Sequence, residues 1–269
     1  MSGRRAAAVR LLSAAAALLL AAGPVLAAAD TVASPKIRPL HRRSSYSDDS
    51  ALQPDTEVID APTTGVLTNY GYSTRSRFYA QGGILEYLSF GVYPGINLGA
   101  SGAIDGLVGA EKHVRMRAPT AQVKWRFFDG DEQLPSLAAG FDGQGYGYNS
   151  AERRFNQRQR GFYLVATKEI GVPGFQIHPS INVSDFDTNS IYGALPLTLN
   201  IRDKAEILAE WDNIANWRDS RANLGLRVFL TPSFNVDFAV RAIGAGGFYS
   251  DGTRRGPERI VELKYSNSF

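Results

Sequence analysis

From about residue 63 onwards, apolar and polar residues alternate along the chain with a period of two. In the stretch "AQVKWRF", residues 121–127, every second side chain is apolar, with glutamine, lysine and arginine between them. The same alternation recurs at residues 175–183, 205–212, 223–230 and 234–242. Successive side chains of a strand point to opposite faces, so this period indicates strands with one apolar and one polar face. No helical period is sustained in these residues, and the sequence therefore predicts an all-β fold.

Two all-β architectures fit this alternation, a soluble sandwich and a transmembrane barrel. Long, glycine-rich connections such as residues 243–258 alternate along the chain with tight ones such as residues 231–233. Short turns at one end and longer loops at the other are typical of an outer-membrane barrel, whereas a Greek-key sandwich lacks this regularity. We predict a transmembrane antiparallel up-and-down β-barrel over residues 63–269. It has about twelve strands, although ten also fit the pattern.

Two features of the predicted strands leave their register open. In the first third of the barrel, the first turn fits either Ser73–Ser76 or Gly82–Gly83. Pro179 and Pro196 fall within strand patterns, where a proline removes one donor from the hydrogen-bond ladder. The pattern therefore predicts the number of strands better than it predicts their exact pairing.

The N-terminal residues have a different character. Residues 1–29 contain Arg4, Arg5 and Arg10, then an apolar run and small residues suited to cleavage, which predicts a secretory signal peptide. A transmembrane helix is the less favoured interpretation, because the apolar run is short and no stop-transfer flank follows it. Residues 30–62 are polar, contain several prolines and show no apolar period. We expect them to form a disordered periplasmic N-terminal tail.

The last predicted strand ends the chain with "VELKYSNSF", residues 261–269. In an extended strand, Val261, Leu263, Tyr265 and Phe269 share one face. This pattern resembles the C-terminal assembly signal of bacterial outer-membrane β-barrel proteins, although Asn267 stands at a position that is often aromatic. The resemblance implies that the chain is exported to the outer membrane, with membrane lipid and the barrel assembly machinery as its partners.

Charge and cysteine content exclude several other classes of protein. The formal net charge is +3, but the three arginines of the predicted signal peptide account for all of it. The rest of the chain is close to neutral, so we expect no nucleic-acid partner. Because there is no cysteine, the protein can form neither disulfides nor a lipid anchor on an N-terminal cysteine.

Charged residues recur on the polar faces of the predicted strands, from which they would project into the barrel lumen. Both signs occur on neighbouring strands, so cross-strand ion pairs are expected to fill a narrow interior. Such filling is favoured over selective conduction, although the sequence leaves both open. The lumen-facing polar candidates are Lys124, Arg126, Glu206, Glu210, Asp212, Arg227, Asp237, Arg241, Glu262 and Lys264.

The alternatives are a soluble periplasmic or secreted β-sandwich binding protein and a barrel enzyme that acts on lipid. Such an enzyme needs a positioned nucleophile or base, most often a histidine. Of the three histidines, His41 lies in the expected tail, His113 in a predicted outer loop, and His178 on a lumen face as an expected hydrogen-bonding residue. The acidic turn "FDGDEQ", residues 128–133, lacks the ligand spacing of a calcium loop. We predict no catalytic residues, no cofactor and no metal site.

Three short motifs in the middle of the chain carry a more specific resemblance. "LPSLAAGFDGQGYG", "GFYLVATKEI" and "AEILAEWDNI" follow one another in an order similar to that of YjbH-like outer-membrane barrel proteins. The resemblance implies a non-enzymatic barrel that assists exopolysaccharide production or export, with polysaccharide or export components as partners. The chain is much shorter than the large members of that family, so passage of small solutes stays open. The matching residues are Pro135, Ala138, Gly140, Tyr163, Val165, Ala166, Lys168, Ala209, Glu210 and Asp212.

Overall fold

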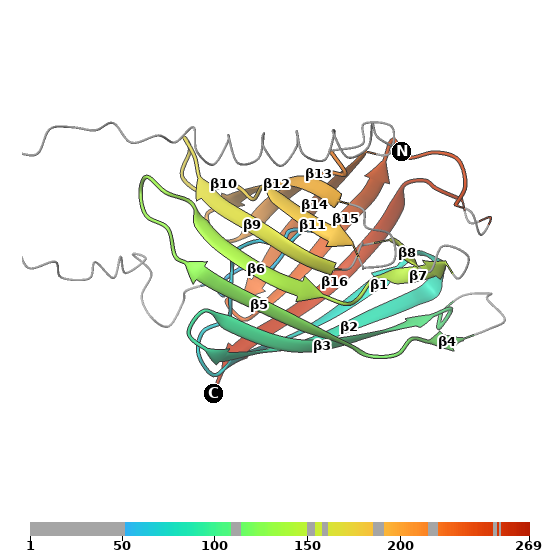
Figure 1. Cartoon of the computed structure of the whole chain (residues 1–269), viewed down its shortest axis with the longest axis horizontal. Coiled ribbons are helices and arrows are strands. Elements are labelled where there is room, and N and C mark those ends of the chain that lie inside the picture. Colours follow the sequence, from blue (N-terminus) through green and yellow to red (C-terminus); the bar gives the residue numbers. More distant parts are fainter. Residues whose placement is uncertain are drawn as a thin grey trace, which may run out of the picture. The chain divides into compact units, whose positions relative to one another are not determined.

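The strands form one antiparallel sheet that closes on itself as a barrel (Figure 1). In this computed structural model, the described residues are 52–108, 114–149, 154–157, 161–184, 191–214, 220–249, 252 and 254–269. The first strand, β1 (Gly71–Tyr79), pairs with the last, β16 (Glu258–Ser268), and β12 (Ile191–Ile201) pairs with β13 (Ala205–Asp212), so the sheet closes. The predicted closed barrel is therefore confirmed, and the sandwich alternative is wrong because no sheet edge remains to separate two layers.

The barrel of the described residues has twelve strands. Of the fourteen strands in the sheet, the short β4 lies off the main path, and β10 and β11 are two halves of one barrel strand on either side of Pro179. The strands of the sheet are β1 (Gly71–Tyr79), β2 (Gly83–Tyr93), β3 (Ile96–Asp105), β4 (Arg115–Met116), β5 (Thr120–Phe128), β6 (Ser136–Asp142), β9 (Gly161–Glu169), β10 (Phe175–Ile177), β11 (Ser180–Ser184), β12 (Ile191–Ile201), β13 (Ala205–Asp212), β14 (Arg221–Thr231), β15 (Phe234–Ile243) and β16 (Glu258–Ser268).

The connections differ between the two ends of the barrel. At the turn end, successive strands are joined by residues 94–95, 129–135, 170–174, 202–204 and 232–233. The loop end carries the three longest connections, residues 106–119, 143–160 and 244–257, and the second of these contains the hairpin of β7 (Tyr146–Asn149) and β8 (Arg154–Gln157). At the same end, β1 turns into β2 through the short helix η1 (Ala80–Gly82), so Gly82–Gly83 and not Ser73–Ser76 is where the first turn falls.

Large apolar side chains cover the outside of the barrel. Trp125, Leu226 and Phe238 expose 54%, 42% and 51% of their surface, because they point away from the lumen. The charged neighbours of two of them in sequence, Arg227 and Asp237, are buried inside. A continuous apolar outer face with a polar interior is the inverse of a soluble protein and is typical of a barrel in lipid.

Residues 52–67, here called the inner segment, lie inside the barrel. Val58 and Ile59 are almost fully buried and pack against Leu85, Leu208 and other apolar residues of the wall. Burial of these two side chains contributes about 1.5–3 kcal/mol each. The expectation of a disordered tail up to residue 62 is therefore wrong for residues 52–62. Residues 30–51, like the predicted signal peptide at 1–29, lie outside the described part of the chain.

The C-terminal strand is fully paired, with β1 on one side and β15 on the other. Val261 and Leu263 are partly buried, whereas Tyr265 is exposed and Phe269 is 89% exposed. The ring of Phe269 lies 4.9 Å from the ring of Tyr72 on β1. The interpretation of these residues as an assembly signal stays a prediction. Among the described residues, no helix has the length and apolar character needed to span a membrane.

Candidate functional site in the barrel lumen

The inner segment forms a hairpin-like loop within the lumen. Gln53 and Pro54 lie beside the β14–β15 turn at the turn end of the barrel, and the chain runs inward from there to Asp60. It then returns, with a backbone bridge between Glu57 and Pro62, and Leu67 precedes the start of β1. This segment therefore enters and leaves the lumen through the same end.

Each acidic side chain of the inner segment pairs with arginines of the barrel wall. Asp55 pairs with Arg227, and Glu57 pairs with Arg75 and Arg77. Asp60 lies 2.7 Å from Nη1 of Arg77 and also contacts Arg241 on β15. A buried arginine without its acid would be strongly destabilising, so these pairs fix where the segment lies.

The wall also binds the backbone of the inner segment. One carboxylate oxygen of Glu210 accepts the N–H groups of Ile59, Asp60 and Ala61 at 2.6, 2.9 and 2.9 Å. The other oxygen accepts Nδ2 of Asn223 at 2.9 Å, which orients the carboxylate. Three convergent N–H groups on one anion form a strong set of charge-assisted hydrogen bonds. Glu210 therefore holds the tip of the segment, residues 59–61, in place.

On the opposite side, Lys124 of β5 holds the base of the segment. Its ammonium group donates to the backbone carbonyls of Thr56, Thr63 and Gly65 at 2.5, 3.2 and 3.2 Å. Gly65 is required at this point, because a Cβ there would lie 2.0 Å from the carbonyl oxygen of Asp55. The two limbs of the inner segment thus approach each other too closely for any side chain at residue 65.

Ion pairs within the wall fill much of the remaining interior beside β14, β15 and β16. Arg227 donates to both carboxylate oxygens of Asp237 at 2.8 Å, and Arg77 donates to Glu262 at 2.6 Å. Lys264 lies between Asp237 and Glu262, at 3.4 and 3.6 Å from them. These contacts are the cross-strand pairs expected of a narrow barrel interior.

The structure buries eight of the ten predicted lumen residues inside the barrel: Lys124, Glu206, Glu210, Arg227, Asp237, Arg241, Glu262 and Lys264. Asp212 is half-buried at the loop end of β13, next to Asn223. Arg126 is also half-buried, but it pairs with the exposed Asp129 at the turn end and joins none of the central clusters.

Several residues of this interior were not singled out from the sequence. Arg75 and Arg77 lie on β1, where the open register hid their shared face, although both follow the period of two. No sequence pattern marked the acids of the inner segment as lumen residues, because their arginine partners lie on strands far away in the chain. Asn223 was not predicted, because the sequence argument rested on charged residues and an asparagine on a polar face carries no charge.

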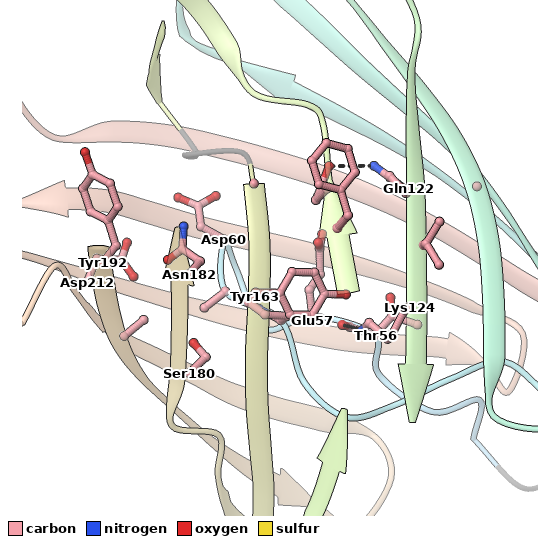
Figure 2. Close-up of a pocket in the computed structure, with 18 of the residues that line it drawn as sticks. Thr56, Glu57, Asp60, Gln122, Lys124, Tyr163, Ser180, Asn182, Tyr192 and Asp212 are labelled. Carbon is pink, nitrogen blue, oxygen red and sulfur yellow. Dashed lines mark hydrogen bonds between the residues drawn. The ribbon is translucent and has the colours of Figure 1, made fainter. Parts of the chain in front are cut away.

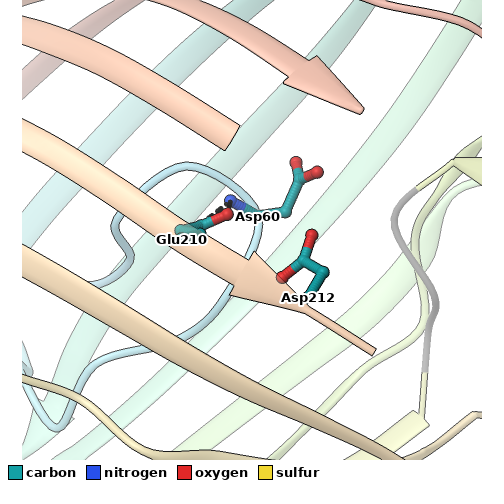
Figure 3. Close-up of side chains that lie close together, drawn as sticks. All are labelled: Asp60, Glu210 and Asp212. Atoms are coloured by element: carbon teal, nitrogen blue, oxygen red, sulfur yellow. Dashed lines mark hydrogen bonds between the residues drawn. The ribbon is translucent and has the colours of Figure 1, made fainter. Parts of the chain in front are cut away.

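Asp60, Glu210 and Asp212 offer carboxylate oxygens within 4.8 Å of one another (Figure 3). Each of the three carboxylates, however, already has partners in the protein. Asp60 pairs with two arginines, Glu210 accepts backbone N–H groups, and Asp212 accepts Nδ2 of Asn223 at 2.7 Å. The cluster therefore serves to position the inner segment, and its geometry alone does not define a metal site.

Beside the inner segment lies a cavity of about 120 Å³ (Figure 2). One side of it is formed by the inner segment, including Thr56, Glu57 and Asp60. The other side comes from β5, β6, β9, β11 and β12, whose side chains here include Tyr163 and Asn182. The lumen therefore has a filled half and a half with free space.

His178 and the acidic turn around Asp131, both considered in the sequence analysis, have hydrogen-bond partners in the structure. His178 is buried between two hydroxyl groups, with Nδ1 2.9 Å from Thr167 and Nε2 3.3 Å from Thr198. In the β5–β6 turn, Asp131 accepts the N–H groups of Gln133 and Leu134 at 2.7 Å, and these hydrogen bonds lower the pKa of Asp131. Both residues have structural partners that account for them. His41 and His113 lie outside the described residues.

The fold and the lumen define the molecule as a closed antiparallel β-barrel with an apolar outer face, a polar interior and residues 52–67 of the chain inside. The chain matches no protein family and no curated protein. Among solved structures, it is similar to the KdgM porin, at 11% identity over 74% of this chain and 99% of that chain, with a TM-score of 0.49. It is also similar to the NanC porin, at 10% identity over 74% and 99% of the two chains, with a TM-score of 0.44. The assignment as a barrel rests on the strand pairing described above.

Proposed function

We propose that the protein is an outer-membrane, porin-like channel that passes small polar solutes through the space beside the inner segment. The observation that carries this proposal is the polar cavity inside a closed barrel whose outer face is apolar. Lipid can cover the outside without leaving a backbone group unpaired, because every barrel strand has a neighbour on both sides. The free half of the lumen supplies the polar surface that a solute would follow.

The size of the cavity argues for small solutes. A cavity of about 120 Å³ is of the same order as the roughly 150 Å³ cavity that accommodates one benzene ring in another protein, so it suits solutes of about one ring. A structure of the KdgM porin contains disordered oligogalacturonate, but an oligosaccharide does not fit beside the inner segment in its present position. The exopolysaccharide role that the YjbH-like motifs imply would require the segment to move, and it stays a prediction.

We also infer that the protein is not an enzyme. Among the described residues, His178 is buried between threonine hydroxyls, and the acidic cluster around Glu210 is occupied by backbone and side-chain donors. Neither arrangement leaves a nucleophile next to an available base, which lipid hydrolysis would require. A passive channel needs no such pair.

The test combines location with conductance. We expect the protein in the outer-membrane fraction, with a gel mobility that changes on heating, as closed barrels show. Purified protein in a planar bilayer should give small, stable conductance steps in potassium chloride. Recovery as a soluble periplasmic protein would refute the location, and an intact barrel that carries no current above the bare bilayer would refute the channel.

A further inference from the structure

The inner segment is a fixed boundary of the cavity. Its backbone is bound on one side by Lys124, which donates to three of its carbonyls, and on the other by Glu210, which accepts three of its N–H groups. Its acids pair with wall arginines that are at most 6% exposed. The width of the free space is therefore set by the folded protein and does not adjust to each solute.

The charges that line this space balance one another. The cavity contains four basic side chains, which are Arg75, Lys124, Arg221 and Arg241. It also contains four acidic side chains, which are Glu57, Asp60, Asp142 and Asp212. An ion that enters would lose part of its hydration and gain no net attraction from the lining.

Two of the four acids are also neutralised by a neighbouring arginine, and a third is hydrogen-bonded to amide groups. Glu57 pairs with Arg75, and Asp60 pairs with Arg241. Asp142 accepts Nε2 of Gln122 at 3.1 Å and the N–H of Gln144 at 3.0 Å. Asp212 lies within 4.8 Å of Asp60, but Arg241 beside Asp60 offsets these two acids, so the lining as a whole attracts neither sign strongly.

The remaining lining combines hydroxyl and amide groups with aromatic rings. Ser180, Asn182 and the two tyrosines Tyr163 and Tyr192 come from three neighbouring strands (Figure 2). Hydroxyl and amide groups both donate and accept hydrogen bonds, and they therefore match the hydroxyl groups of a sugar. Aromatic rings offer flat apolar surface to the C–H faces of such a molecule.

We infer that the solutes of this channel are neutral, hydroxylated molecules of one-ring size, such as monosaccharides and short polyols. The inference rests on the proposed channel function and adds the class of solute to it. Charge balance excludes a preference for ions, the fixed boundary excludes larger oligomers, and the hydroxyl and amide lining favours sugar-like partners.

The test measures swelling of proteoliposomes that contain the full chain, in isotonic glycerol, glucose, sucrose, sodium gluconate or glucosamine hydrochloride. Glycerol and glucose should enter faster than into empty vesicles. Sucrose should enter about ten-fold more slowly than glucose, because two rings exceed the cavity. Gluconate and glucosamine should each enter about three-fold more slowly than glucose, because they lose hydration without compensation.

Two substitutions of single lining charges test the charge argument. Asp142→Asn leaves one excess positive charge and should raise the ratio of gluconate to glucosamine entry about two-fold to three-fold, and Arg221→Gln should lower it by a similar factor. The inference is overturned if wild-type vesicles admit either ion faster than glucose, if sucrose keeps pace with glucose, or if neither substitution moves the ratio. Glycerol entry without glucose entry would refute only the solute class. Failure of both to enter would refute the channel itself.

Discussion

Removal of the Glu210 carboxylate should release the tip of the inner segment. In the Glu210→Ala variant, the N–H groups of Ile59, Asp60 and Ala61 lose the acceptor that they share. A hydrogen bond to a charged acceptor contributes about 1.5–3 kcal/mol, but water can reach the freed groups from the cavity and offset part of the loss. We expect local opening of the tip to become easier by about 3 kcal/mol.

The opening can be measured through a single thiol, because the chain contains no cysteine. Ile59→Cys places that thiol at a side chain that is 2% exposed. Its rate of reaction with a membrane-impermeant thiol reagent reports how often the tip leaves its place. A change of about 3 kcal/mol corresponds to a rise in rate on the order of a hundred-fold in the Glu210→Ala background.

The matched control is Glu169→Ala, which removes an exposed carboxylate at the end of β9 and should leave the rate unchanged. Thr68→Cys, at an exposed position outside the lumen core, should react quickly in every background. The reasoning is refuted if the Ile59→Cys thiol reacts equally fast with and without Glu210 while the barrel keeps its heat-modifiable mobility. Faster reaction accompanied by loss of that mobility would mean that Glu210 stabilises the whole barrel and not the segment alone.

Three further predictions concern stability and conductance. Gly65→Ala should displace one limb of the inner segment and raise single-channel conductance, whereas Gly246→Ala, with no atom within 4 Å of the added Cβ, should not. Leu226→Arg should lower the unfolding free energy in lipid vesicles by about 2–4 kcal/mol if this exposed residue lies near the bilayer midplane. Ser233→Arg, in the β14–β15 turn, should lower it much less. Equal losses in the two variants would mean that the outer face is misassigned. Asp237→Ala should lower the unfolding free energy by about 1.5–3 kcal/mol, because both hydrogen bonds from Arg227 to this acid are lost while Asp55 and Glu206 remain as its partners. An unchanged denaturation midpoint would contradict this role.

The period of two was enough to predict an all-β fold of two-faced strands, and the turn and loop lengths then favoured the barrel over a sandwich. The period depends only on local geometry, since each strand must present one face to lipid and the other to the lumen, and a shift of one residue would exchange the faces. The alternation around Arg227 and Asp237 therefore predicted both an interior position and an opposite charge next to it. Turn and loop lengths added the up-and-down order, because they record the chain reversals directly.

Only the tertiary structure determined that the inner segment is ordered inside the barrel. The stretch from Asp55 to Asp60 has no period and too few apolar residues to bury itself, so its sequence is typical of a disordered tail. It becomes ordered only because the closed barrel supplies arginines, a lysine and the Glu210 carboxylate from strands far apart in the chain. Those partners converge once all the strands are paired. The sequence by itself therefore determined the wall of the barrel, whereas the closed fold determined what fills it and how much space is left for a solute.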